Sequence, residues 1–198
     1  MVASLLIVLS APPVIQVARP PDRAIRRLVI LAAVAIAGLA TMAMSLTLDP
    51  FTLPFVLLIG VLWAIAPSRE DVVPAGQPSL VMLAAVVVAV VPLVLYALGQ
   101  AELQRTDHAS QHAAFFHWVE TSFYAIAILL LGFLAALRPA AFHMATWMSG
   151  LALAILGAAS LLLGQHASAI ASPWSWAALV GGAGFVVIGE WESRRQGP

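Results

Sequence analysis

The chain is divided by one polar stretch, which reads QAELQRTDHASQHAAFFHWVETSFY and spans Gln100–Tyr124. It carries three of the five histidines and four of the nine charged side chains that lie beyond Asp71. Long apolar runs flank it on both sides, and no other polar interruption in the chain is as long. If the chain has a chemical site, we therefore expect it within this stretch or packed against it.

The composition is typical of a protein embedded in a bilayer. Of 198 residues, 62% are hydrophobic and 9% are charged, and the mean hydropathy is +1.00. A soluble globular chain is about 45–50% apolar and about 25% charged. Most of the apolar runs also exceed the ~18 residues needed to cross a hydrocarbon core. The sequence thus predicts an all-α integral membrane protein in contact with the lipid bilayer. A formal charge of zero gives no reason to expect nucleic acid as a partner.

The apolar runs predict one polytopic domain, residues 1–198, with seven transmembrane helices. Asp49-Pro50 is expected to form a tight turn that also starts the third helix. The predicted spans cover residues 2–18, 28–48, 51–66, 79–99, 118–137, 142–164 and 174–190.

The fifth predicted helix is longer than a bilayer requires. We expect it to begin near Thr106, a candidate N-cap, with Asp107 in its first turn, and to run to Leu137. Its length of about 32 residues is about 48 Å, against a hydrocarbon core of about 30 Å. Its first three turns, which hold His108 and His112, are therefore predicted to extend beyond the bilayer on the outer side.

The arginines predict the orientation. With residues 19–27 in the cytoplasm, eight of the nine arginines fall inside and only Arg105 falls outside. The N-terminus is then outside and the C-terminus cytoplasmic, in a multi-pass protein of the cell membrane. The basic loop is interpreted as a topology signal, with anionic-lipid binding as the alternative; its arginines are Arg19, Arg23, Arg26 and Arg27. The tryptophans agree, with Trp118, Trp174 and Trp176 at outer helix ends and Trp63, Trp147 and Trp191 at inner ones.

Missing residue types exclude several chemistries. The chain has no cysteine and no lysine, so disulfides, thiolate metal sites and Schiff bases are impossible. No charged residue lies in the centre of a predicted span, which argues against an ion- or proton-coupled transporter. A metal-dependent hydrolase using Asp107 finds only loose support, and an enzymatic role is less favoured than a non-enzymatic one.

The polar stretch supplies most of a candidate ligand or partner site. On one continuous helix, His108 and His112 share a side, while His117 and Glu120 share another side about 140° away from His108. One helix therefore cannot direct all four at one ion, although His166, from the loop before the last helix, could complete either pair. The full candidate set is Asp107, His108, His112, His117, Glu120, Tyr124 and His166, with His108, His112, His117 and His166 as candidate metal ligands.

The chemistry of this set leaves alternatives open. A histidine pair with a carboxylate suits zinc or copper, and paired imidazoles suit haem iron. The competing interpretation is a solvated helix extension in which His117 and Glu120 bond to each other or to a nearby loop. Glu120 is expected to face the bundle, held there by His117 or Tyr124, or joined with His117 and His166 around a cation.

Three functions follow as hypotheses. The first is a non-enzymatic accessory, assembly or sensing subunit whose outer face contacts a ligand or another membrane protein. The second is a metal- or haem-binding membrane protein that uses the outer histidines and Glu120. The third is an uncoupled small-solute carrier or channel, in which Ser and Thr side chains line a path through the bundle.

Overall fold

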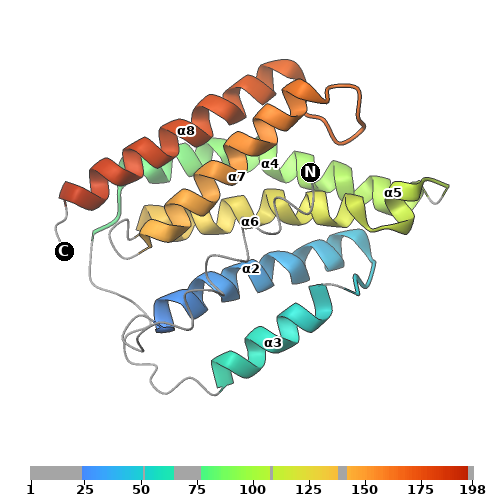
Figure 1. Cartoon of the computed structure of the whole chain (residues 1–198), viewed down its shortest axis with the longest axis horizontal. Helices are drawn as coiled ribbons and strands as arrows, with labels where there is room; N and C mark the ends of the chain where they lie inside the picture. The colour runs from blue at the N-terminus through green and yellow to red at the C-terminus, as the bar shows by residue number, and fades with distance from the viewer. Residues whose placement is uncertain (1–23, 51, 65–76, 108, 138–141, 196–198) are drawn as a thin grey trace.

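The computed structural model of the chain describes residues 24–50, 52–64, 77–107, 109–137 and 142–195, with side chains from Arg27 onward. The described residues form helices and their connections, and contain no strand. Figure 1 shows the long helices running roughly along one another, with successive helices reversing direction. The helices are α2 (Ala24–Ser45), α3 (Thr52–Ala64), α4 (Leu80–Thr106), α5 (Gln111–Ala114), α6 (His117–Leu137), α7 (His143–Leu162) and α8 (Ser172–Arg195).

Five helices of the described part are long and apolar enough to cross a membrane, namely α2, α4, α6, α7 and α8. The structure is therefore all-helical where it is described, as expected for a helical membrane protein. Seven spans are not confirmed. The predicted span 2–18 lies outside the described residues, and α3 has 13 residues, about 20 Å of helix, which is short for a core of about 30 Å.

The boundaries around α2 differ in part from the prediction. This helix begins at Ala24, so Arg26 and Arg27 belong to its first turn, and the Arg27 side chain is buried. Arg19 and Arg23 lie outside the described residues. At the other end, Asp49 Oδ2 accepts hydrogen bonds from the backbone N–H of Thr52, at 3.1 Å, and from its hydroxyl. Asp49 therefore caps α3, which fits the predicted turn.

The prediction of one long fifth helix is wrong. Thr106 is the last residue of α4, which has 27 residues, rather than an N-cap. After it the chain turns through the short α5, and Phe116 adopts a left-handed backbone with φ of 58° before α6 begins at His117. A residue with positive φ ends the run of i to i−4 hydrogen bonds, so the polar segment forms the connection between α4 and α6 instead of the first turns of α6.

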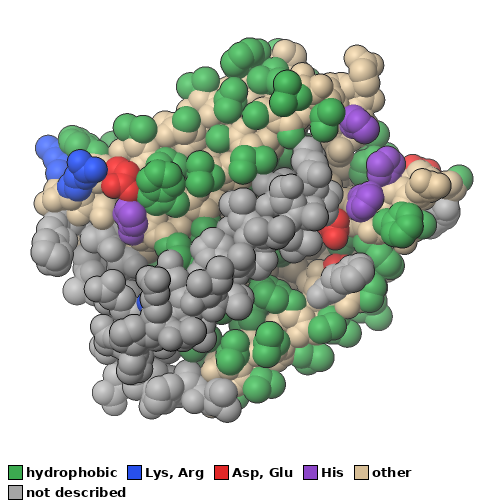
Figure 2. Space-filling model, viewed as in Figure 1, with side chains coloured by type: hydrophobic (Ala, Val, Ile, Leu, Met, Phe, Trp, Pro, Cys, Tyr) green, Lys and Arg blue, Asp and Glu red, His purple; other side chains and the backbone are tan. Residues whose placement is uncertain are grey.

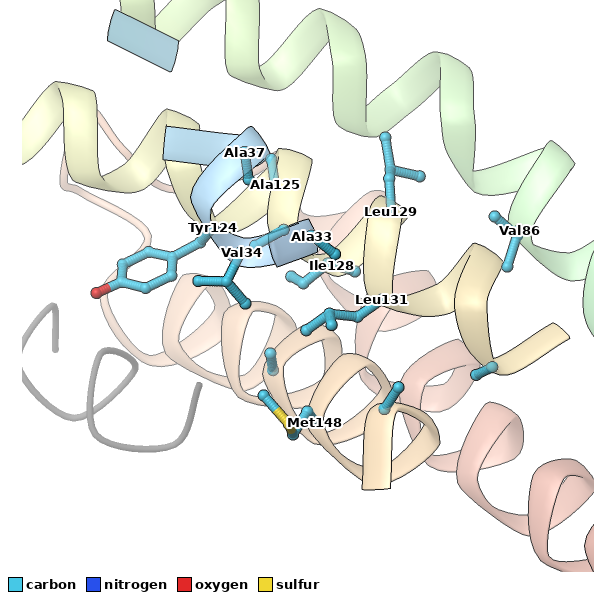
Figure 3. Packing of buried hydrophobic residues seen from close by; sticks show 14 of the residues in the cluster. Ala33, Val34, Ala37, Val86, Tyr124, Ala125, Ile128, Leu129, Leu131 and Met148 are labelled. Atoms are coloured by element: carbon cyan, nitrogen blue, oxygen red, sulfur yellow. The ribbon is translucent and has the colours of Figure 1, made fainter. Parts of the chain in front are cut away.

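The core is built around α6. In its most apolar window 72% of the residues are buried, against 22% in α4. It packs against α4, α2 and α7, which surround it in Figure 1. Figure 3 shows the contact between these helices, with Val34 of α2, Val86 of α4, Leu131 of α6 and Met148 of α7 among the buried side chains. Buried hydroxyls add bonds between helices: Ser122 donates to the carbonyl of Ala97 and Ser149 to that of Ile128, at 2.9 and 2.8 Å.

A glycine seam holds α7 against α8, the most extensive helix contact in the described part. A methyl group on Gly157 would stand 2.5 Å from the backbone of Ser175 and Leu179. One on Gly182 would stand 2.5 Å from the backbone nitrogen of Ala154. The two backbones therefore touch, which agrees with the expectation that small residues let membrane helices approach closely.

Candidate functional site at the histidine end of the bundle

Three connections meet at one end of the bundle, which we call the histidine end. They are residues 46–50 between α2 and α3, residues 107–116 between α4 and α6, and residues 163–171 between α7 and α8. The opposite end, where α8 finishes with Arg194 and Arg195, is called the arginine end. Figure 2 shows histidine side chains gathered at the end where α5 lies, and arginine side chains at the opposite end.

The short helix α5 is fixed by polar contacts that its sequence encodes. Ser110 caps it, since its hydroxyl accepts from the backbone N–H of Ala113 at 3.2 Å. Gln104, buried on α4, donates from Nε2 to the carbonyl of Ala113 at 3.0 Å. Ala113 itself is buried. This turn of helix is thereby attached to the end of α4, and it carries His112.

The break in the helix brings His112 and His117 together. Their Nδ1 atoms lie 3.1 Å apart and their ring centroids 5.4 Å apart. Each ring has a further aromatic neighbour. The ring centroids of His112 and Trp118 lie 5.0 Å apart, and those of His117 and Phe115, which are stacked, lie 6.1 Å apart. On a continuous helix, residues five apart point about 140° away from each other, so the prediction that these histidines lie on different sides is wrong.

His166 faces the same cavity from another part of the chain. A pocket of about 450 Å³ is lined by His112 and His117, by Trp118 and Thr121 of α6, by the end of α7, and by the loop that carries His166. The backbone of His166 is held within that loop, because its N–H donates to Leu163 and its carbonyl accepts from Ala169. The fold therefore gathers three of the four predicted metal ligands around one cavity, while His108 lies outside the described residues.

The remaining candidate residues are dispersed. Asp107 is the C-cap of α4 and its N–H donates to the carbonyl of Leu103 at 2.9 Å. Tyr124 is 1% exposed and belongs to the core, where Figure 3 shows it beside α2. Neither residue lines the histidine pocket.

Glu120 stands one turn beyond His117, outside the pocket lining. It is half-buried, and its Oε2 atom has no hydrogen-bond partner in the described part of the structure. The predicted bond from His117 to Glu120 is not formed among the described residues, since His117 pairs with His112 instead.

Two features were not predicted as part of a site. Trp118 faces the inside of the protein rather than lipid, because it is 4% exposed and lines the pocket. At the arginine end, Glu190 accepts from Trp147 Nε1 at 2.7 Å, pairs with His143, and lies 3.8 Å from Arg194. The sequence signalled only the last contact, by its i to i+4 spacing, because the other two join α7 to α8 over more than 40 residues.

A second cavity, about 660 Å³, is an apolar groove between α4 and α8. Its lining includes Val88 and Pro92 of α4 and Trp174 of α8, and its side chains are mostly aliphatic or aromatic. It offers few groups that would bind a polar ligand, so the chemistry of the described part is concentrated at the histidine end.

The structure and the comparisons together define a class and no family. The fold is that of a helical membrane protein with a histidine-lined pocket at one end. The chain matches no protein-family model, no curated protein and no solved structure.

Proposed function

We propose that this chain is a non-enzymatic accessory or sensing subunit of the cell membrane, whose pocket at the histidine end receives a ligand or a partner. The arginine distribution supports an orientation with the histidine end outside and the arginine end in the cytoplasm. Seven spans with the N-terminus outside remain part of this proposal.

The histidine pocket carries the proposal. Its lining comes from α5, α6, α7 and the loop after α7, so the pocket exists only in the folded bundle. Small-molecule sites are concave and combine apolar walls with a few convergent polar groups. Here the polar groups are three imidazoles together with the side chains of Thr121, Ser160 and Ser168.

The carrier hypothesis receives less support. Hydroxyl groups that line a solute path need to face that path, yet several buried ones are bonded to helix carbonyls. Ser122 and Ser149 make the bonds between helices described above, so their hydroxyls act as contacts between helices. Ser175 donates to the carbonyl of Ile170 at 2.8 Å, in the loop just before its own helix.

Haem is also disfavoured, for a geometric reason. Two histidines that ligate one haem iron approach it from opposite faces of the macrocycle. His112 and His117 instead contact each other through Nδ1, which leaves no space for a porphyrin between them. A metal ion without a macrocycle needs far less space.

Site-specific photo-crosslinking in native membranes tests the proposed function. A photoreactive amino acid at Ala169, which lines the pocket, should yield a discrete adduct. The matched control is Val187, an exposed position on α8, which should yield lipid adducts alone. The adduct at position 169 should disappear when His117 is replaced by Ala. An adduct pattern identical to that of position 187 would contradict the proposal.

A further inference from the structure

The separation of the two histidine Nδ1 atoms is close to that of two ligands on one metal ion. Imidazole nitrogen binds Zn²⁺ at about 2.0–2.1 Å, so two such ligands at a tetrahedral centre stand about 3.3 Å apart. The Nδ1 atoms of His112 and His117 are 3.1 Å apart. A shift of a few tenths of an ångström therefore places both nitrogens at bonding distance from one ion.

Each of the two rings has one further aromatic neighbour, and the backbone that carries it is held by a hydrogen bond. Trp118 contacts the ring of His112, and Phe115 stacks on that of His117. The Thr121 hydroxyl donates to the carbonyl of His117 at 2.6 Å. Gln104 fixes the turn that carries His112. Such supporting contacts orient metal ligands before the ion arrives.

The pocket lining favours a cation over an anion. It contains no arginine and no lysine, so an anion would find no permanent positive charge there. The hydroxyl of Ser160 accepts from the N–H of Ile170 at 3.2 Å. Besides the hydroxyls of Thr121 and Ser168, the lining offers imidazole nitrogens, which suit divalent ions of the first transition row.

We infer that His112 and His117 form a preset half of a site for a divalent transition-metal ion such as Zn²⁺, completed by His166. No three His, Asp or Glu side chains of the described residues already stand at metal-binding distance. The His166 side chain, which is exposed and already lines the pocket, therefore moves toward the histidine pair on binding, and water fills any remaining position. This inference rests on the proposed function, since the ion would be the group of this pocket to which the proposed ligand or partner binds.

Titration of the purified full chain with Zn²⁺ tests the inference, with Co²⁺ as a spectroscopic probe of coordination. The protein must carry no histidine tag. We expect one saturable ion per chain and at least a tenfold weaker affinity in His112→Ala, His117→Ala and His166→Ala. Because the ligating imidazoles must be neutral, affinity should also fall as the pH is lowered and protons compete with the ion.

Two variants serve as matched controls. His143→Ala removes the histidine of the arginine end, and Glu120→Gln removes the nearby carboxylate that lies outside the pocket lining. Both should bind Zn²⁺ like the native chain. His112→Asn, with unchanged helicity and elution volume, separates ligand loss from misfolding.

Several outcomes would overturn the inference. They are the absence of saturable 1:1 binding, affinity that survives loss of His112 or His117, an unchanged His166→Ala variant, or equal weakening in His143→Ala. If Zn²⁺ fails to bind while position 169 still crosslinks in a His117-dependent manner, only the metal inference is wrong. If both experiments fail, the proposed function fails as well.

Discussion

At the scale of single residues, Phe116 has the largest consequence for the site. Its left-handed backbone separates α5 from α6 and sets the direction in which His112 approaches His117. This conformation costs an L-residue with a side chain about 1–2 kcal/mol, and glycine avoids most of that cost. The surrounding contacts, including the Ser110 cap and the Gln104 bond, must offset it.

A pair of substitutions at Phe116 tests this account. Phe116→Gly and Phe116→Ala both remove the ring, but only glycine relieves the strain at positive φ. The glycine variant should therefore be more stable than the alanine variant by about 1 kcal/mol, the reverse of their order inside a helix. Unfolding in detergent measures the difference. An alanine variant of equal or greater stability would place residue 116 in a right-handed helix.

At the scale of helices, the contact between α7 and α8 depends on a lack of side chains. The glycines of this seam recur at seven-residue spacing, with Gly150 and Gly157 on α7 and Gly182 and Gly189 on α8. Residues seven apart share one side of a helix, so each helix presents a line of bare backbone to the other. The pocket depends on this contact, because the end of α7 and the following loop form one of its walls.

Adjacent glycines of α8 provide a direct test. Gly182→Ala places a methyl group against the backbone of Ala154, which cannot rotate away, so a loss of about 1–3 kcal/mol or more is expected. Gly181→Ala meets no atom within 4 Å and should leave stability unchanged, or raise it by up to about 1 kcal/mol. Thermal unfolding of both variants and of the native chain in the same detergent measures the difference in stability. Equal effects would mean that α8 is rotated relative to the described contact.

At the scale of the whole molecule, the two ends differ in chemistry. The histidine end carries the pocket, with Trp174 and Trp176 exposed at the start of α8. The arginine end carries Arg194 and Arg195, and Trp191 lies beneath the guanidinium of Arg195 at 3.9 Å. Exposed aromatic residues at both ends are typical of the two interfaces of a bilayer.

Cysteine labelling tests the orientation of the whole molecule. Because the native chain has no cysteine, only the introduced residue can be labelled. Ala167→Cys lies in the exposed loop after α7, and Ser193→Cys lies near the end of α8. A membrane-impermeant maleimide should label position 167 in intact cells and position 193 only after permeabilisation. The opposite pattern would place the histidine end in the cytoplasm.

The sequence by itself determined the class of this protein and the location of its polar chemistry. Hydropathy is a local property, so the long apolar runs predicted the apolar parts of α2, α4, α6, α7 and α8. The polar ends were predicted less well, since α4 continues to Thr106, beyond its predicted end at residue 99. The Asp49 cap was predictable for the same reason, because it acts only three residues away. The histidines of Gln100–Tyr124 were also recognised as a group before their arrangement was known.

Only the tertiary structure decided how that group is arranged. Residues 107–116 contain neither glycine nor proline, the usual signals of a helix break, and a serine such as Ser110 does not by itself locate one, so the left-handed backbone of Phe116 was not predicted. The break reverses the expected separation of His112 from His117 and leaves Glu120 outside the pocket. His166 reaches the same cavity through the packing of α7 and α8, a contact between distant segments that local sequence patterns do not encode.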